Sequence, residues 1–316
     1  MVYQNILLDE KQNSELQKEG FVVLPFLNEN EISELATFFN QKITLDEGDF
    51  YATAHANDIS FRSEMSDKIV AVIQDKVDSY FKNHELLGAS YIVKSKGLSQ
   101  ALQPHQDWNI VDESSYRSYN IWIPLVDLNE ENGAILVMPK SHSWIINYRH
   151  SSISCSFQKV HQQIWENMKP LFLKAGEALI YDHALLHASM PNVSQKDRIA
   201  CACGIIPDDA TMRFYWNNNG KVEEYESSKE FFLTENIFSG PHGLKKIKYI
   251  DTDFISIDEK VFFELIGIEK PNVITVDSIE IETKFLAKKA FWKVYTISNI
   301  TNEIKSRIKS YTFKKK

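Results

Sequence analysis

An imidazole and a carboxylate stand two positions apart at His105 and Asp107. In an extended strand, residues i and i+2 point to the same face, so we expect these two side chains to converge. Two histidines and one carboxylate on one face of an iron ion leave coordination positions open, which oxygen chemistry requires. The pair alone is more typical of a polar surface, so this interpretation depends on a second histidine elsewhere in the chain.

Two histidines, His183 and His187, are candidates for the missing ligand. Spaced by four residues, they could bind zinc together from one face of a helix. This alternative lacks the glutamate of the H-E-x-x-H motif, and the run that begins at Gly176 is typical of a strand. We therefore take His187 as the third ligand and His183 as a packed or supporting histidine.

Arg198 begins a further β-rich run, eleven residues after His187. A guanidinium inside an apolar barrel is costly unless an anion pairs with it, and a carboxylate matches its bidentate geometry. The spacing favours a carboxylate-binding role over that of an arginine in solvent at a strand end. Cys201 and Cys203 alternate out of phase with Arg198, so we expect them to pack outside the barrel as small hydrophobic residues.

The segments that position these residues change in character near residue 90. Before it, helices are predicted at 9–19, after a cap at Asn28 or Asn30, and at 67–81, with an apolar strand at 21–27. Short β-rich runs separated by turn residues follow, at 89–93, 119–126, 134–138, 178–181 and 199–206. Many short strands favour a sandwich or barrel, here with helices packed outside it. Residues 208–250 are interpreted as loop-rich and aromatic, and 251–283 predict no particular element.

Composition narrows the class of protein. The 316 residues are 43% hydrophobic and 25% charged, which is typical of a globular chain, and no apolar run approaches the length of a membrane-spanning helix. Three cysteines do not make a disulfide framework and the start does not resemble a signal peptide, so a cytoplasmic location is expected. The net charge is −8, and residues 284–316 carry ten Lys or Arg against one acid. The acidic remainder argues against nucleic acid as a partner.

Four segments of the chain resemble the phytanoyl-CoA dioxygenase family of Fe(II)/2-oxoglutarate oxygenases, and their order and spacing carry the resemblance over about residues 15–207. They are Glu-Gly-Phe-Val-Val-Leu-Pro at 19–25; Lys94-x-x-Gly97 with Pro-His-Gln-Asp-Trp at 104–108; Asn-Ile-Trp-Ile-Pro-Leu-Val-Asp at 120–127 leading to Pro-Lys-Ser-His at 139–142; and Gly-Glu-Ala-Leu-Ile-Tyr at 176–181 with His187-Ala-Ser189, Asn192-x-Ser194 and Arg198. One departure is Lys140, where relatives usually have glycine.

The resemblance implies a mainly β fold with flanking helices, whose core is a double-stranded β-helix, or cupin-like jelly roll. It implies that His105, Asp107 and His187 bind Fe(II), and that Arg198 holds the far carboxylate of the co-substrate 2-oxoglutarate. The further residues implied at the co-substrate are Ser189, Trp122 and Asn120. O₂ would be the second co-substrate. Because Asp107 fills the position that halogenating relatives leave to a small residue, halogenation is not expected.

Substrate residues are expected in the helical N-terminal region and at the mouth of the barrel, where relatives contact their substrates. The candidates are Trp108, Arg62, Asn57 and Arg213, together with Tyr51 and His55. Arg62 or Arg213 could hold a substrate carboxylate or phosphate, although a solvated arginine is the more common case.

The predicted domain covers residues 1–250, with the β-helix core at about 90–207 and an extension of unassigned role at 251–316. Ile residues at three- and four-residue steps in 297–311 predict a basic amphipathic helix, which either packs on the acidic body or contacts a membrane surface or carrier protein. The predicted reaction is hydroxylation of an unactivated C–H bond in a small metabolite or natural-product intermediate, with 2-oxoglutarate converted to succinate and CO₂. The alternatives are desaturation or cyclisation by the same oxidant, and a non-catalytic metal-binding cupin-like protein.

Overall fold

The computed structural model describes residues 4–46, 50–97, 99–251 and 254–267. Its N-terminal part alternates helix and strand as predicted. Helix α1 (Glu10–Glu19) is capped by the Asp9 carboxylate, which accepts a hydrogen bond from the Gln12 N–H, and it ends at Gly20 with φ +85°. Strand β1 (Phe21–Pro25) leads to α2 (Glu29–Lys42), where Asn28 and Glu31 form a reciprocal capping box.

Helix α3 (Ile59–Tyr80) is longer than the sequence pattern predicted, because it begins at Ile59 and not at Asp67. The Asp58 carboxylate caps it by accepting from the Phe61 N–H. Its buried stripe, which contains Ile69, Ile73 and Val77, packs on the outer face of the main sheet. Strand β2 (Phe50–Ala52) and the short 3₁₀ helix η1 (Thr53–His55) connect α2 to α3.

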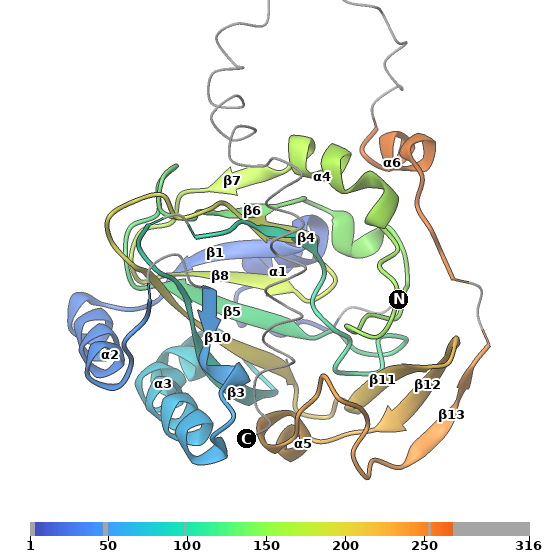
Figure 1. Cartoon of the computed structure of the whole chain (residues 1–316), viewed down its shortest axis with the longest axis horizontal. Helices are drawn as coiled ribbons and strands as arrows, with labels where there is room; N and C mark the ends of the chain where they lie inside the picture. The colour runs from blue at the N-terminus through green and yellow to red at the C-terminus, as the bar shows by residue number, and fades with distance from the viewer. Residues whose placement is uncertain (1–3, 47–49, 98, 252–253, 268–316) are drawn as a thin grey trace, which may run out of the picture. The chain divides into compact units, whose positions relative to one another are not determined.

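Two antiparallel sheets form the core of the fold (Figure 1). The larger has the order β1-β8-β5-β10-β3-β2 and adds β3 (His84–Lys94), β5 (Tyr119–Pro124), β8 (Glu177–Asp182) and β10 (Arg198–Pro207). The smaller has the order β4-β9-β6-β7, with β4 (Leu102–His105), β6 (Ile135–Val137), β7 (Lys169–Leu171) and β9 (His187–Ser189). The fold is mainly β with flanking helices and a jelly-roll core, which confirms the predicted class.

Alternate side chains along β10 belong to two different apolar clusters. Ala200 and Ala202 pack with Trp122 and Leu179 in the apolar cluster on the inner face of the sheet. Cys201 and Cys203 belong instead to the cluster that the sheet forms with α2 and α3. The prediction that the cysteines lie outside the barrel is therefore confirmed, and Arg198, in phase with Ala200, belongs to the inner face.

The interpretation of residues 208–250 as loop-rich is wrong. They form a three-stranded antiparallel sheet, β11 (Arg213–Asn218), β12 (Lys221–Glu226) and β13 (Lys246–Ile250), with helix α5 (Lys229–Thr234) between the last two strands. Asn219 and Gly220, with φ of +51° and +88°, make the tight turn between β11 and β12. Buried Phe214 and Tyr225 pack with Phe231 of α5, so the aromatic residues form a small core of their own.

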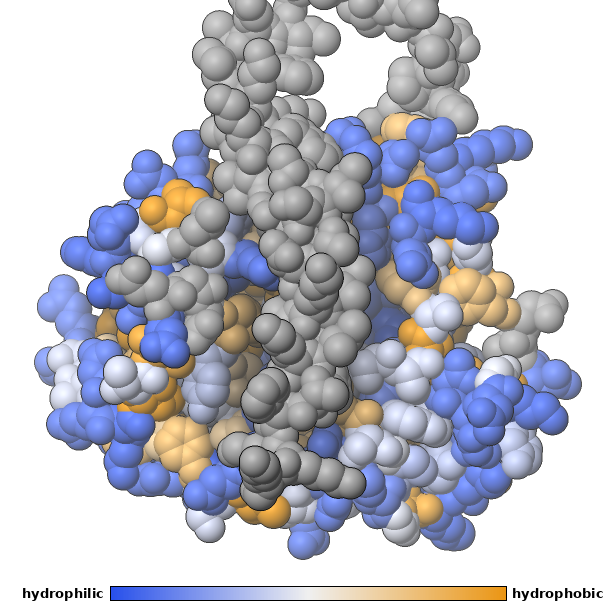
Figure 2. Space-filling model, viewed as in Figure 1, coloured by the Kyte–Doolittle hydropathy of each residue, from blue (hydrophilic) through white to orange (hydrophobic). Residues whose placement is uncertain are grey.

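The remaining elements cover the smaller sheet. They are the 3₁₀ turns η2 (Ser141–Ser143) and η3 (Gln158–Val160) and the helices α4 (His161–Asn167) and α6 (Glu259–Leu265). Ile257 and Phe262 of the segment after residue 250 pack with Phe157 and Leu186. The predicted amphipathic helix at 297–316 lies outside the described residues. On the face shown in Figure 2, hydrophilic side chains lie among smaller hydrophobic areas. No helix among the described residues has the length and hydropathy to cross a membrane.

Candidate metal and co-substrate site

The structure brings His105, Asp107 and His187 together. One ligand atom from each lies within 4.8 Å of the other two. His105 and His187 are direct cross-strand partners on β4 and β9, and their ring centroids are 4.2 Å apart. Strand pairing therefore joins two residues that are far apart in the sequence, and Asp107 completes the set from the segment after β4.

Hydrogen bonds to backbone carbonyls orient both imidazoles. His105 Nδ1 lies 2.8 Å from the carbonyl oxygen of Gln103, and His187 Nδ1 lies 2.9 Å from that of Leu185. A ring nitrogen that donates to a carbonyl leaves the other nitrogen as the metal-binding atom. The two Nε2 atoms lie 4.0 Å and 3.7 Å from Asp107 Oδ1, so both face the carboxylate.

The protonation states suit metal binding. Burial and the neighbouring His187 lower the pKa of His105 to about 4, so its imidazole is neutral at pH 7. Burial alone would raise the pKa of Asp107, but His187, His183 and His105, together with the hydrogen bond from Tyr181, outweigh it and lower that pKa to about 2. Neutral imidazole and ionised carboxylate are the forms that bind a metal ion.

Tyr181, to which the sequence analysis assigned no role, touches the same carboxylate. Its hydroxyl donates to Asp107 Oδ2 at 3.0 Å, and it accepts a hydrogen bond from Asn120 Nδ2 at 3.0 Å. Burial and the adjacent Asp107 hold the pKa of Tyr181 well above its ordinary value, so the phenol keeps its proton. Asn120, predicted at the co-substrate, therefore contacts the metal site through Tyr181.

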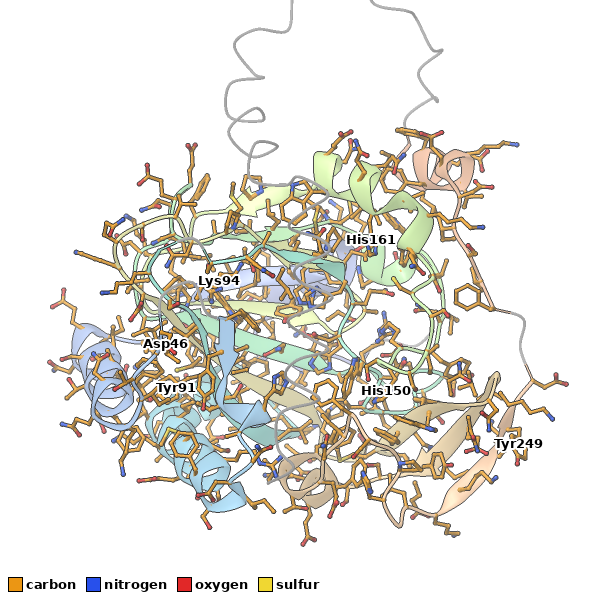
Figure 3. All side chains as sticks on the ribbon, in the orientation of Figure 1. Asp46, Tyr91, Lys94, His150, His161 and Tyr249 are labelled. Carbon is orange, nitrogen blue, oxygen red and sulfur yellow. The ribbon has the colours of Figure 1, made fainter. Side chains whose placement is uncertain are left out.

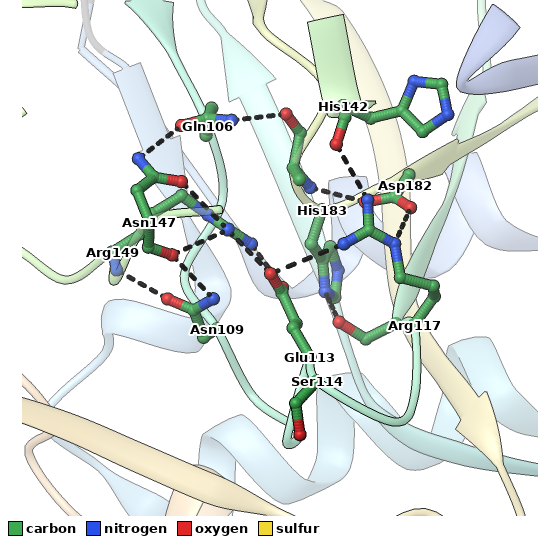
Figure 4. Close-up of polar contacts among 12 residues, drawn as sticks. Gln106, Asn109, Glu113, Ser114, Arg117, His142, Asn147, Arg149, Asp182 and His183 are labelled. Atoms are coloured by element: carbon green, nitrogen blue, oxygen red, sulfur yellow. Dashed lines mark hydrogen bonds and ion pairs between the residues drawn. The ribbon is translucent and has the colours of Figure 1, made fainter. Parts of the chain in front are cut away.

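A buried ionic network supports the backbone of Asp107. Figure 4 shows its charged members Glu113, Arg117, Arg149 and Asp182. Arg149 Nε donates to the Asp107 carbonyl at 2.7 Å, and the Arg149 guanidinium pairs with Glu113. Arg117 lies 3.6 Å from Glu113 and donates to Asp182 at 2.8 Å. Sequence reasoning missed these residues, because Arg149 and Asp182 join Glu113 and Arg117 from other segments of the chain.

Arg198 is almost fully buried, at 2% exposure, and lies beside Trp122, which was also predicted at the co-substrate. Its guanidinium carbon lies 5.3 Å from the centre of the Trp122 ring, and Nη1 lies 3.3 Å from the Ile92 carbonyl oxygen. Nε has no hydrogen-bond partner in the described part of the chain. Burial lowers the pKa of Arg198 to about 10, so the guanidinium stays charged at pH 7.

Lys94 adds a second buried cation beside Arg198. Its ammonium donates to the carbonyl oxygens of Gln100, Ser189 and Met190 at 2.8, 3.3 and 2.6 Å. Burial and the charge of Arg198 lower the pKa of Lys94 well below its usual value. Ser189, predicted at the co-substrate, is buried on β9, and its backbone carbonyl oxygen accepts a hydrogen bond from Lys94.

Glycine keeps space open at these cations. At Gly133, with φ +83°, a Cβ would lie 3.0 Å from Lys94 Cδ, 3.2 Å from the Met190 carbonyl oxygen and 3.6 Å from Arg198 Nε. The donor set of two imidazoles and one carboxylate fits Fe(II), and the buried guanidinium with an unpaired N–H fits a carboxylate. The residues present therefore fit both an iron ion and a dicarboxylate.

Two other histidines, His183 and His142, are buried in the structure. His183 is buried, its Nδ1 lies 2.8 Å from the Ser118 hydroxyl, and it is outside the three-residue metal cluster of the described residues. His142 lies in the 3₁₀ turn η2 and is buried, with Nε2 3.0 Å from the Gln17 carbonyl oxygen. Lys140 before it adopts φ +68°, the left-handed conformation that suits the glycine of relatives.

The predicted substrate residues differ in their surroundings. Trp108 follows Asp107 and packs between His150 and Phe238, with ring centroids 4.2 and 5.1 Å away; His150 is labelled in Figure 3. Asn57 is exposed just before α3. The two arginines already have protein partners. Arg62 donates to the carbonyl of Thr234 at 2.9 Å, and Arg213 pairs with Glu224 at 2.8 Å. The Arg62 contact joins α3 to α5, and the Arg213 contact joins β11 to β12.

Comparison with known proteins agrees with this geometry. The sequence profile of the phytanoyl-CoA dioxygenase (PhyH) family matches residues 16–200. The chain is 28% identical over 153 residues to a phytanoyl-CoA dioxygenase domain-containing protein 1 homolog of Dictyostelium discoideum, covering 46% of this chain and 51% of the relative. It is 24% identical over 149 residues to phytanoyl-CoA dioxygenase of Arabidopsis thaliana, covering 46% and 53%. The chain thus spans about half the length of these curated relatives.

Among solved structures, the non-heme alpha ketoglutarate dependent epimerase SnoN from nogalamycin biosynthesis superposes with a TM-score of 0.51 at 17% identity. The superposition covers 78% of this chain and 96% of SnoN, which shows a shared fold. Since the family profile covers more than half of the sequence and includes all three clustered residues, the chain belongs to the phytanoyl-CoA dioxygenase family of Fe(II)/2-oxoglutarate oxygenases.

Proposed function

We propose that this protein uses Fe(II), 2-oxoglutarate and O₂ to hydroxylate an unactivated C–H bond of a small metabolite or natural-product intermediate. In the overall reaction one oxygen atom enters the substrate, and 2-oxoglutarate becomes succinate and CO₂. The observation that carries the proposal is the presence in one barrel of the His105–Asp107–His187 donor set and of buried Arg198 with an unpaired Nε. An unpaired buried donor on a charged group is costly unless a ligand satisfies it.

Each residue has a defined task in this proposal. His105 and His187 would hold the iron through Nε2, and Asp107 through its carboxylate. Arg198 would bind the far carboxylate of 2-oxoglutarate, with the Lys94 ammonium as a second buried group beside it, and Trp122, stacked on Arg198, keeps that guanidinium out of water. When bound, iron and 2-oxoglutarate supply the oxidising power from O₂. The protein contributes orientation and exclusion of solvent.

The same donor set supports desaturation or cyclisation, because the metal ligands do not determine the fate of the substrate after hydrogen removal. Substrate position decides between these outcomes, and the wall beside Asp107 is aromatic, with Trp108 against His150 and Phe238. Hydroxylation is therefore proposed as the basic reaction, to be checked by the mass of the product once a substrate is found. A hydroxylated product gains one oxygen atom, whereas a desaturated or cyclised one loses two hydrogen atoms.

The first test measures binding without oxygen. Fe(II) and then 2-oxoglutarate are titrated anaerobically into the wild type, His105→Ala and Arg198→Ala, and succinate is measured after O₂ is admitted. We expect His105→Ala to lose iron affinity, and Arg198→Ala to bind iron normally but 2-oxoglutarate at least roughly tenfold more weakly.

Lys174→Ala serves as a control, because this lysine is exposed and pairs only with exposed Asp127 on the surface. If the wild type binds neither iron nor 2-oxoglutarate, the oxygenase proposal fails. If it binds metal but not 2-oxoglutarate, the alternative of a non-catalytic metal-binding cupin-like protein is favoured.

A further inference from the structure

Tyr181 lies at the centre of a hydrogen-bond chain that ends on a metal-ligand candidate. Asn120 on β5 and Tyr181 on β8 are direct cross-strand partners, and the Asn120 amide donates to the phenol oxygen at 3.0 Å. The phenol proton then points to Asp107 Oδ2 at 3.0 Å. His187 Nε2 lies 3.4 Å from the same hydroxyl, so the single phenol proton has two possible acceptors at unequal distances.

The shorter contact decides where that proton goes. The phenol oxygen accepts a hydrogen bond from Asn120, so its own O–H points elsewhere. Of its two possible acceptors, Asp107 is the closer and the charged one. Nε2 of His187 consequently keeps its lone pair for a metal. The two oxygens of Asp107 also become different: Oδ2 is hydrogen-bonded to Tyr181, whereas Oδ1 is the oxygen closer to both histidines, at 3.7 and 4.0 Å.

This difference matters for the number of open metal positions. An octahedral ion held by two imidazoles and one carboxylate oxygen has three positions left, two for a chelating 2-oxo acid and one for O₂. A carboxylate that bound through both oxygens would occupy one of them. We propose that Tyr181 is a positioning residue, which holds Oδ2 of Asp107 so that this carboxylate binds metal through Oδ1 alone and leaves room for the co-substrate.

The surroundings of Tyr181 are built for this role. The side chain is 3% exposed and packs in the inner cluster with Trp122 and Leu179. Its ring centroid is 4.7 Å from that of His187, so the ring cannot turn away without losing this contact. Asn120 Oδ1 has no partner in the described part of the chain, so the amide contributes its N–H to Tyr181 and is not held by a competing bond.

The test compares Tyr181→Phe with the wild type. This inference rests on the proposed function, so the wild type must first bind Fe(II) and 2-oxoglutarate anaerobically; if it does not, the proposed function itself has failed. Given that binding, we expect Tyr181→Phe to weaken 2-oxoglutarate binding to the iron-loaded protein by roughly tenfold. Affinity for the metal alone should change much less, because Asp107 gains a second metal contact as it loses the phenol.

Co(II) substitution provides a readout that does not require turnover. The visible absorption of Co(II) reports its ligands and their geometry, and in Tyr181→Phe we expect the bands to shift from those of the wild type before 2-oxoglutarate is added, because a second oxygen of Asp107 replaces a water. Asn120→Leu keeps the phenol but removes the donor that orients it, and should give a smaller shift in the same direction.

Tyr91→Phe is the matched control, because Tyr91 is also fully buried and donates one hydrogen bond, to the Leu35 carbonyl at 3.0 Å, but outside the metal cluster. It should leave the Co(II) spectrum and 2-oxoglutarate affinity unchanged. The proposal is overturned if Tyr181→Phe leaves both unchanged. It is also overturned if metal affinity falls as much as 2-oxoglutarate affinity, since that result means a general supporting role.

Discussion

Lys94 and Arg198 are direct cross-strand partners on β3 and β10, and their exposures are 0% and 2%. Burial lowers the pKa of both groups, and the neighbouring charge of Arg198 lowers that of Lys94 further. The carbonyl oxygens around Lys94 offset part of the cost, but they carry only partial charge. A bound dicarboxylate would supply the missing negative charge, so the unpaired Arg198 Nε is a sign of a ligand site.

Removal of one of these groups should therefore weaken the binding of 2-oxoglutarate and leave the binding of the metal unchanged. We expect Lys94→Met to lower the affinity of the iron-loaded protein for 2-oxoglutarate by roughly tenfold, because it removes a buried cationic group next to Arg198 and frees the carbonyls that this group holds. Anaerobic calorimetry of Fe(II) and then 2-oxoglutarate measures both steps. Lys174→Met, at an exposed lysine, is the control. Unchanged 2-oxoglutarate affinity in Lys94→Met would show that Lys94 only supports the loop carbonyls.

Gly133 offers a steric test of the same pocket. Gly133→Ala places a methyl group 3.0 Å from Lys94 Cδ and forces φ +83° on an L-residue. We expect a loss of at least about 1 kcal/mol of unfolding free energy and weaker 2-oxoglutarate binding. Gly220→Ala separates the two effects, because Gly220 has φ +88° and a methyl group added there would meet nothing within 4 Å. If both variants bind 2-oxoglutarate equally, the space at Gly133 has no role in the site.

The clustering of His105, Asp107 and His187 could be predicted from the sequence, although the reason given for it was only partly right. The short β-rich runs indicated the barrel that pairs His105 with His187, but β4 ends at His105, so Asp107 reaches the cluster from the segment after the strand and not by strand alternation. The start of α3 was missed although Asp58 is a good N-cap residue, since the apolar stripe that indicated the helix begins only at Ile69.

The supporting residues could not be predicted in this way. Glu113 pairs with Arg149, 36 positions away, and no periodic pattern links them. Tyr181 has the pattern of one more apolar residue in a buried strand, and its role depends on Asn120 and Asp107 in two other segments. The β11–β12 hairpin was missed for a different reason. Its Asn-Gly turn at 219–220 is a strong signal, but the charged Glu223 and Glu224 hid the strand pattern.

The Glu113 carboxylate should be essential for the network behind Asp107. Glu113 is 7% exposed and faces Arg149 and Arg117, so Glu113→Gln leaves two buried guanidinium groups with one fewer negative charge. We expect a loss of about 3–5 kcal/mol in unfolding free energy and weaker metal binding, because Arg149 also holds the Asp107 carbonyl. Denaturant unfolding measures the first and metal titration the second. Glu264→Gln, in an exposed pair with Lys260, should change neither.

Stability should fall as the pH is lowered below about 6.5. Burial lowers the pKa of His150 to about 4, so between these values the unfolded chain binds a proton that the folded chain does not. The contribution of His150 is thus present above the unfolded pKa and is lost as pH falls through the folded one, by at most about 1.4 kcal/mol per pH unit. Unfolding curves from pH 4 to 7.5 should show a shallower pH slope for His150→Phe. An equal slope would contradict this account.

Lys140, where the family resemblance predicts glycine, has a backbone conformation that favours that residue. It has φ +68°, and its N–H donates to the Glu19 carbonyl at 2.8 Å, which ties the turn before η2 to the end of α1. The side chain is exposed, so only the backbone conformation opposes it. Lys140→Gly should raise the unfolding free energy by about 1 kcal/mol, measured by denaturant unfolding. Lys140→Ala removes the same side chain but keeps the strain and should give no such gain; if it stabilises the protein equally, the side chain and not the backbone is responsible.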